Sequence, residues 1–404
     1  MRKIAALYKE AYTGLSPSTW LLSLVMLINR AGTMVVPFMT LYLTQRGYSI
    51  SSAGMVMALF GCGAICGGII GGKLTDKIGF YRVQLFALAG GGLIFFLLGQ
   101  VTSLPMICAT AFLSSLVNES FRPANAAAIV QYSKEENRTR SYSLNRLAIN
   151  VGWACGGALG GFIASHNYQL LFWIDGCTNI SAAVMLWLFL RPSKNQVDLH
   201  KTKIAKAHTT GNSAYRDKPY LVFVVLTMLF AYCFFQSFST LPVFYKQQLK
   251  YTESYIGMVM AINGILITLF EMIIVHQLER KKRTLTYIPI GVMLIGLSFV
   301  TFNILPLWFP LAIVWVLFVT AGEIFSMPFL NSFWISRTSP ENRGQYAGLY
   351  TVAWSVAQVL GPATGAQIAE HYGFEVLWWF VGFICTVAIS GFIWLNRKVN
   401  SATA

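Results

Sequence analysis

Long apolar stretches separated by short polar segments make up most of this 404-residue chain. A helix needs about 20 mainly apolar residues to cross a bilayer, and the pattern contains twelve candidate stretches. They lie near residues 19–43, 52–71, 83–101, 104–131, 142–165, 168–190, 219–246, 254–277, 286–304, 306–336, 345–369 and 373–396. The strict alternation of apolar and polar residues that is typical of strands is absent. The pattern therefore predicts an all-α membrane protein with twelve transmembrane helices.

Composition supports this fold class and excludes several others. Apolar residues make up 55% of the chain and charged residues only 11%, whereas soluble domains carry about 25% charged residues. So few charges exclude a soluble enzyme, a disordered protein and a repeat solenoid. The seven cysteines all fall in apolar stretches, which favours buried thiols over a metal site or a disulfide framework. The first apolar stretch is too long for a signal peptide and is predicted to be a retained span.

The net charge of +15 is distributed in a way that predicts membrane orientation. If the N-terminus is cytoplasmic, 24 of the 30 Lys and Arg residues fall in cytoplasmic segments and three fall in outer loops. Because positive residues accumulate on the cytoplasmic side, both termini are predicted there, in a bacterial cytoplasmic (inner) membrane. The basic residues lie in short clusters between spans and form no stripe on a helix, so nucleic acid is not an expected partner.

The two halves of the chain resemble each other at a nearly constant offset. Residues Gly54–Ala58 recur as Gly257–Ala261, 203 positions later, and the glycine-rich segment 152–160 corresponds to 357–365. The basic stretch 191–218 divides six spans from six. These features predict a six-helix bundle at 1–190, a cytoplasmic linker at 191–218 and a second six-helix bundle at 219–404. Parallel repeats of this kind are typical of transporters that bind substrate between their halves.

A loop between the second and third spans carries the most specific motif, Gly72-Lys-Leu-Thr-Asp-Lys-Ile-Gly-Phe-Tyr-Arg82. It resembles the conserved loop of the major facilitator superfamily, although Phe80 and Tyr81 stand where that family often has basic residues. The resemblance implies the major facilitator fold and transport by alternating access. The residues predicted to form a gating loop are Gly72, Asp76, Lys77, Gly79 and Arg82. An aspartate there can pair with a base or with the N-terminus of a helix, and so hold the cytoplasmic side shut.

Two further motifs resemble the drug:proton antiporter branch of that superfamily. The fifth span contains Gly152-x3-Gly156-Gly157-x2-Gly160-Gly161, with Gly157 where the branch has proline. The tenth span reads Gly322-Glu323-x4-Pro328, which is similar to a stretch in several proton-driven multidrug exporters.

Charged residues inside the spans are the main candidates for transport chemistry, because a charge within a bilayer needs a partner or a water-filled cavity. The candidates for proton coupling are Glu119, Arg122, Glu323 and Asp175. Glu119 and Arg122 share a helix face at i,i+3, so protonation of the glutamate would release the arginine; a static salt bridge is the alternative. Asp175 has functional and structural interpretations of equal weight.

A second set of residues is predicted to line a substrate cavity. Its members are Asn29, Arg30, Met34, Glu119, Arg122, Arg146, Phe235, Gln236 and Glu323. For Arg30 a structural ion pair is the alternative, and for Arg146 a packing pair near the end of its span. Glu271 is interpreted as structural.

Energy coupling follows from what the chain lacks. It contains no Gly-x4-Gly-Lys-Ser/Thr loop for ATP, and its five histidines are scattered, so no cofactor or metal is expected. The leading hypothesis is a monomeric secondary transporter in the lipid bilayer that exports small amphipathic or drug-like molecules in exchange for protons. The alternative is a proton symporter that imports a polar solute such as a peptide, sugar acid or siderophore. A membrane enzyme or receptor is disfavoured because no catalytic constellation is present.

Overall fold

The computed structural model describes residues 14–133, 138–190, 213–279, 284–306, 308, 310–338 and 343–401. Within these ranges the chain is helical and contains no strand. Most of the predicted basic linker, residues 191–212, lies outside the described residues.

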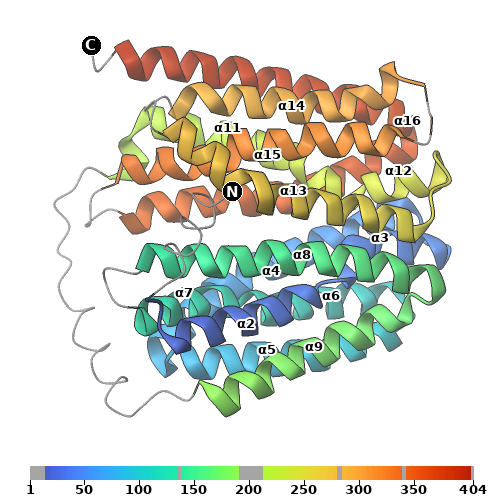
Figure 1. Cartoon of the computed structure of the whole chain (residues 1–404). Coiled ribbons are helices and arrows are strands. Elements are labelled where there is room, and N and C mark those ends of the chain that lie inside the picture. Colours follow the sequence, from blue (N-terminus) through green and yellow to red (C-terminus); the bar gives the residue numbers. More distant parts are fainter. Residues whose placement is uncertain are drawn as a thin grey trace, which may run out of the picture. The chain divides into compact units, whose positions relative to one another are not determined.

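The helices follow the apolar stretches of the sequence closely (Figure 1). In the first half they are α2 (Pro17–Ala31), α3 (Val35–Gln45), α4 (Ile50–Ile78), α5 (Phe80–Gln100), α6 (Leu104–Glu119), α7 (Phe121–Tyr132), α8 (Arg138–His166) and α9 (Gln169–Phe189). In the second half they are the short η2 (Ala214–Arg216), α11 (Lys218–Ser239), α12 (Leu241–Gln247), α13 (Glu253–Glu279), α14 (Thr284–Ile304), α15 (Leu311–Ser336) and α16 (Arg343–Ser401).

Eleven helical segments of the described chain are long and apolar enough to cross a membrane. The last of them, in α16, is interrupted by Gly373, which has a φ of +86° and is not helical. Glycine adopts this left-handed conformation without steric cost. The segments on either side of Gly373 correspond to the two last predicted spans, so the structure is consistent with twelve spans.

Three spans are broken where a proline follows closely. α2 and α3 are separated at residues 32–34, α6 and α7 at Ser120, and α11 and α12 at Thr240. Prolines at positions 37, 123 and 242 come shortly after these breaks. Because proline has no N–H and clashes with the preceding turn, it favours an interruption at such points. The breaks free backbone groups within apolar spans, and these groups need partners.

The chain packs as two compact units. The first comprises Met1–Val36 with Leu59–Ala205, and the second comprises Pro37–Ala58 with Lys206–Ala404. The second unit therefore includes most of α3 and the beginning of α4. There the Ser51 N–H donates to Glu370 Oε2 at 2.6 Å, and Gly54 packs against Pro362 and Ala366 of α16.

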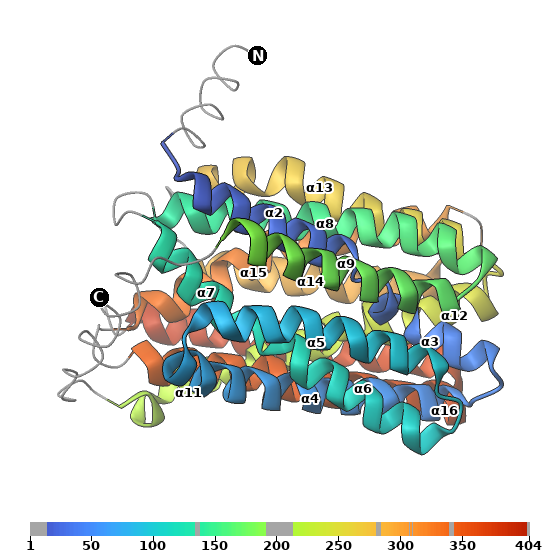
Figure 2. The same cartoon turned by 90° about the horizontal axis from the view of Figure 1, so that it is seen from below.

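Within the first unit, α2 packs against α8 and α9, while α5 packs against α6, α7 and α9. The helices α2, α8 and α9 run side by side in both views (Figure 1 and Figure 2). Leu22 and Val25 of α2, Phe121 of α7 and Leu186 of α9 contribute to the apolar core of this unit.

Within the second unit, α11 packs along α16, and α14 packs against α15 and α16. The fully buried Trp378 lies at the centre of an aromatic cluster, with ring centroids of Phe244, Phe299 and Phe302 at 5.3, 5.2 and 5.5 Å. Such offset and edge-on ring contacts stabilise a core beyond simple burial.

Candidate functional site

The break between α2 and α3 is capped by a carboxylate from α9. The side chain of Asp175 is fully buried and accepts hydrogen bonds from the Met34 N–H (3.0 and 3.1 Å to its two oxygens) and the Val35 N–H (2.9 Å). The first N–H groups of a helix have no partner within it, and a helix N-terminus favours a negative charge. Asp175 therefore satisfies the amides that the break exposes at the start of α3.

A pair of amide side chains extends this polar region from α9 to α2. Asn29 Nδ2 donates to Asn179 Oδ1 at 2.8 Å, and Asn179 Nδ2 donates to the Asp175 carbonyl oxygen at 2.8 Å. All three side chains are buried. The structure thus brings the predicted site residues Asn29, Met34 and Asp175 together, and adds Asn179, which the sequence did not single out.

Three of the predicted charged residues also belong together in the first unit. Arg122 Nη2 and Glu119 Oε2 form an ion pair of 2.9 Å across the break at Ser120. The Glu119 side chain is 16% exposed and that of Arg122 is 72% exposed, so the pair reaches from the helix packing toward open space. Glu119 and Arg122 also interact electrostatically with Arg30 of α2.

Glycines of α8 hold the end of α2 in place. A Cβ atom on Gly152 would lie 2.5 Å from the Cβ of Arg30, and one on Gly156 would lie 3.2 Å from the Ala31 carbonyl oxygen. The glycines of the antiporter-like motif therefore permit a close approach of α8 to Arg30. Arg146, another predicted cavity residue on α8, is exposed.

In the second unit, the predicted residue Glu323 lies on α15 against α13. It is 9% exposed, and its Oε1 accepts a hydrogen bond from Asn263 Nδ2 at 2.9 Å. The same Asn263 nitrogen donates to Thr320 Oγ1 at 3.0 Å. Asn263 was not predicted from the sequence, although a polar amide in a mainly apolar span is itself a signal of function.

Gln236 of α11 is fully buried and has both ends of its amide engaged. Its Nε2 donates to the Gly361 carbonyl oxygen at 2.9 Å, and its Oε1 accepts from Thr240 Oγ1 at 2.8 Å. The neighbouring Phe235 ring meets the Trp354 ring nearly at right angles, with 6.1 Å between centroids. Gln236 thereby joins α11 to α16.

The predicted gating loop lies between α4 and α5. Asp76 and Lys77 are exposed in the last turns of α4, near Gly72, and Arg82 is exposed in the first turn of α5. Gly79 separates the two helices with a φ of +87°, a conformation that favours glycine. The loop geometry explains the glycine, while the gating role remains a prediction.

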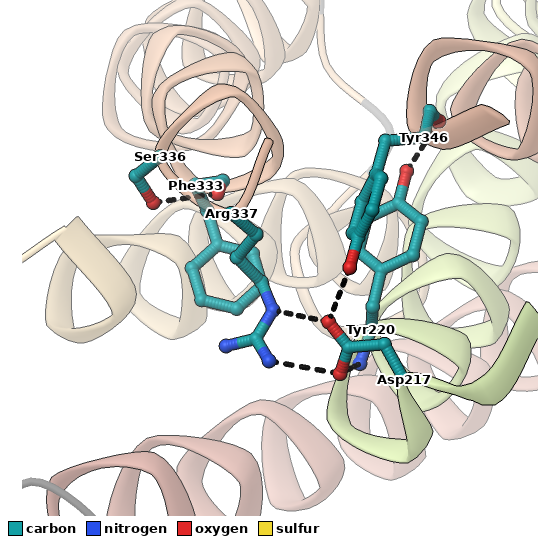
Figure 3. Close-up of polar contacts among 6 residues, drawn as sticks. All are labelled: Asp217, Tyr220, Phe333, Ser336, Arg337 and Tyr346. Atoms are coloured by element: carbon teal, nitrogen blue, oxygen red, sulfur yellow. Dashed lines mark hydrogen bonds and ion pairs between the residues drawn. The ribbon is translucent and has the colours of Figure 1, made fainter. Parts of the chain in front are cut away.

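One charged cluster was not predicted at all (Figure 3). Asp217 accepts two hydrogen bonds of 2.8 Å from Arg337, one of 2.9 Å from the Tyr346 hydroxyl and one of 3.2 Å from the Tyr220 N–H. The Tyr220 hydroxyl in turn donates to the Tyr346 carbonyl oxygen at 2.6 Å. The cluster fastens the beginnings of α11 and α16 to the end of α15.

The electrostatics of the Asp217 cluster favour the ionised carboxylate. Burial alone would raise the pKa of Asp217, but the hydrogen bonds from Arg337, Tyr346 and the Tyr220 amide outweigh it and hold this pKa below its usual range. The signal in the sequence was the Asp217-Lys218-Pro219 order, in which an acidic cap residue precedes a proline in the first helical turn.

Comparison with known proteins gives one family. The model of the Major Facilitator Superfamily matches residues 19–358 and 326–404. The chain is 22% identical to a Na(+), Li(+), K(+)/H(+) antiporter of Planococcus maritimus, over 91% of this chain and 92% of the relative. It is 22% identical to the class H tetracycline resistance protein of Pasteurella multocida, over 86% of this chain and 83% of the relative.

Solved structures show the same fold. A POT family transporter in complex with a thioalcohol conjugated peptide matches with a TM-score of 0.80 and 16% identity, covering 96% of this chain and 98% of that one. The nucleoside transporter NupG matches with a TM-score of 0.73 and 16% identity, covering 94% and 99%.

Proposed function

Because the chain belongs to the Major Facilitator Superfamily, we propose that this multi-pass membrane transporter exports small amphipathic or drug-like compounds in exchange for protons. Membership of the family confirms the resemblance seen in the sequence, and the chain is a transporter rather than an enzyme. Beyond family membership, we propose that the protein exchanges protons for substrate by alternating access. We also propose that it lies in the bacterial cytoplasmic membrane with both termini inside.

The observation that carries the proposal is the environment of Glu323. Its carboxylate is buried within an apolar bundle, with an amide as hydrogen-bond donor and no part in the ion pairs of the described chain. An ionised carboxylate without a cation costs several kcal/mol in such a place. Glu323 therefore favours a state in which it holds a proton, or in which a cationic group of the substrate replaces that proton.

Two other carboxylates are secondary candidates for the proton. Glu119 is paired with Arg122 and can exchange that ion pair for a proton. Asp175 is less suited, since its two oxygens already accept three hydrogen bonds from backbone amides. A proton on Asp175 would disrupt the start of α3.

The direction of transport is proposed from the relatives. Proteins similar to this chain include a cation/proton antiporter and a tetracycline resistance protein, along with the quinolone resistance protein NorA of Staphylococcus aureus at 22% identity over 84% of this chain and 86% of the relative. These names support antiport. The structural matches, at 16% identity, carry only the fold.

Flux in proteoliposomes with an imposed pH gradient tests the proposal, with ethidium, tetracycline and norfloxacin as probes. For the wild type we expect proton movement in one direction to drive the probe in the other. Glu323→Gln should reduce gradient-driven flux by more than about 10-fold while retaining probe exchange without a gradient, because the carboxylate that carries the proton is gone. Glu375→Gln, an exposed carboxylate on α16, is the matched control and should behave as wild type.

Two results would contradict the proposal. Movement of protons and probe in the same direction would establish the alternative, a proton symporter. Unchanged proton coupling in Glu323→Gln would remove Glu323 from the mechanism.

A further inference from the structure

Arg30 carries a positive charge in the middle of the first predicted span, at the end of α2. Gly152 and Gly156 of α8 pack against its backbone and that of Ala31, and glycine at these two positions has no side chain that could accept a hydrogen bond from Arg30. On the α9 side, the amide of Asn179 is already bonded to Asn29. These contacts fix the position of the Arg30 backbone and Cβ.

The hydrogen bonds of the guanidinium are incomplete. Arginine has five N–H donors and no acceptor, and Nε of Arg30 is shielded from solvent yet has no hydrogen-bond partner in the described chain. The nearby carboxylate of Glu119 is engaged with Arg122 at 2.9 Å. The other acid of this unit's spans, Asp175, accepts from the amides of Met34 and Val35.

Charge counting leads to the same point. Arg30, Arg122 and Glu119 together carry a net charge of +1. Water solvates Arg122, which is largely exposed, whereas Nε of Arg30 is shielded from solvent. A charge held away from water without a partner is destabilising, so an arginine of this kind is retained where a ligand supplies the missing charge. A guanidinium binds a carboxylate through two parallel hydrogen bonds, which matches its planar arrangement of donors.

We propose that Arg30 binds the carboxylate of the transported compound, so that the substrate class is amphipathic molecules with one carboxylate at one end. This inference rests on the proposed transport function and narrows its substrate. Binding of one carboxylate brings the net charge of the group around Arg30 to zero.

The first test concerns the protein without ligand. If Arg30 carries an unsatisfied charge, Arg30→Gln should raise the thermal midpoint of the purified full-length protein by about 2 °C. A fall in the midpoint of Arg30→Gln, with recovery in Arg30→Lys, would show that Arg30 is a structural residue and would overturn the proposal.

The second test measures equilibrium binding by thermal shift, with three matched pairs of probes: salicylate and salicylamide, octanoate and octanamide, and norfloxacin and its ethyl ester. For at least one pair we expect the carboxylate to bind wild type at least 10-fold more tightly than its neutral partner. Arg30→Gln should remove this preference and leave binding of the neutral member unchanged, while Arg30→Lys retains part of it. Arg46→Gln, an exposed arginine beyond α3, is the matched control and should bind as wild type.

The outcomes are decisive in each direction. Absence of carboxylate binding in all pairs, equal binding of both members, or a preference that persists in Arg30→Gln overturns the proposal. Because this measurement needs no gradient, it is independent of proton coupling. A failure of the flux experiment on Glu323→Gln would leave it standing.

Discussion

The first span of each unit packs against the last span of the same unit, but the contacts differ in kind. In the first unit the side chains of Asn29 and Asn179 form a hydrogen bond of 2.8 Å between α2 and α9. In the second unit, 204 and 206 positions later, the corresponding residues are Cys233 of α11 and Cys385 of α16, and both thiols are buried. Two amides in one repeat thus correspond to two thiols in the other.

The same contrast holds one turn away. Asp175 of α9 caps the start of α3, while the position 206 residues later is Val381, whose carbonyl oxygen accepts only a weak hydrogen bond from Cys233 at 3.7 Å. The first span is interrupted over residues 32–34 in the first unit, and its counterpart is interrupted only at Thr240. At the longer break a carboxylate from another helix accepts from the exposed amides, whereas at the short break the side chains of Gln236 and Thr240, from the same span, bond to each other.

The largest effect is expected at the cap. Asp175→Ala leaves the amides of Met34 and Val35 without an acceptor, so we expect a loss of about 3 kcal/mol in the free energy of unfolding. Val381→Ala, at the corresponding place in the second unit, removes only two buried carbon atoms and should cost about 1.6 kcal/mol. Unfolding by SDS in mixed micelles measures both. Equal losses for the two variants would contradict the expectation that the first unit depends more on polar bonds than the second.

A second, smaller effect is expected at the helix ends of the two units. Ser16 caps α2 and donates to the Tyr132 carbonyl oxygen at 2.7 Å, while Asp217 caps α11 and forms an ion pair with Arg337. Asp217→Asn should cost about 2 kcal/mol near neutral pH, because charge-assisted hydrogen bonds are roughly twice as strong as neutral ones. Ser16→Ala should cost about 1 kcal/mol.

The two caps should also differ in their dependence on pH. The pKa of Asp217 is lower in the folded protein than its usual value, so its contribution to stability is fully present above about pH 5. This contribution falls as the pH drops below about 4 and is lost below the folded pKa. The difference between wild type and Asp217→Asn should therefore shrink between pH 5 and pH 3, whereas that of Ser16→Ala stays constant. A constant difference for both variants would contradict the assignment.

The smallest effect is expected between paired side chains. A double-mutant cycle with Asn29→Ala and Asn179→Ala should give a coupling free energy of about 0.6–1.7 kcal/mol, the usual range for hydrogen bonds between membrane helices. The corresponding cycle with Cys233→Ala and Cys385→Ala should give less, about 0.3 kcal/mol, because thiols are weak donors and acceptors. A larger coupling free energy for the cysteine pair than for the asparagine pair would contradict the comparison between the units.

Most of the fold could be predicted from the sequence, because the length of an apolar stretch is fixed by the bilayer it must cross. The predicted stretch at 83–101 corresponds to α5 (Phe80–Gln100), and the stretch at 168–190 to α9 (Gln169–Phe189). Breaks were harder to predict, since Gly32 and Thr240 stand inside long runs that are mainly apolar on both sides of the break. Whether such a run is interrupted depends on partners from distant helices, such as Asp175 for α3.

The candidate site could be predicted only in part, for a related reason. Charges within apolar runs are visible in the sequence. Arg30, Glu119 and Glu323 were predicted because a charge inside a membrane is energetically unfavourable unless it has a function or a partner. Asp217 lies beside a basic stretch, and an acidic residue in a polar segment gives no sign of a structural role. Its importance comes from the side chains of Arg337 and Tyr346, which lie 120 and 129 positions away in the chain.

Contact between Gln236 and Gly365 makes the residues tolerated at one position depend on the residue at the other. A Cβ atom at position 365 would overlap the Gln236 amide, which itself bridges to the Gly361 carbonyl oxygen and to Thr240. A larger residue at 365 therefore requires either a shorter side chain at position 236 or a shift of the Gln236 amide that breaks these hydrogen bonds. Among descendants of this chain, a shorter residue at 236 should therefore precede or accompany a larger residue at 365.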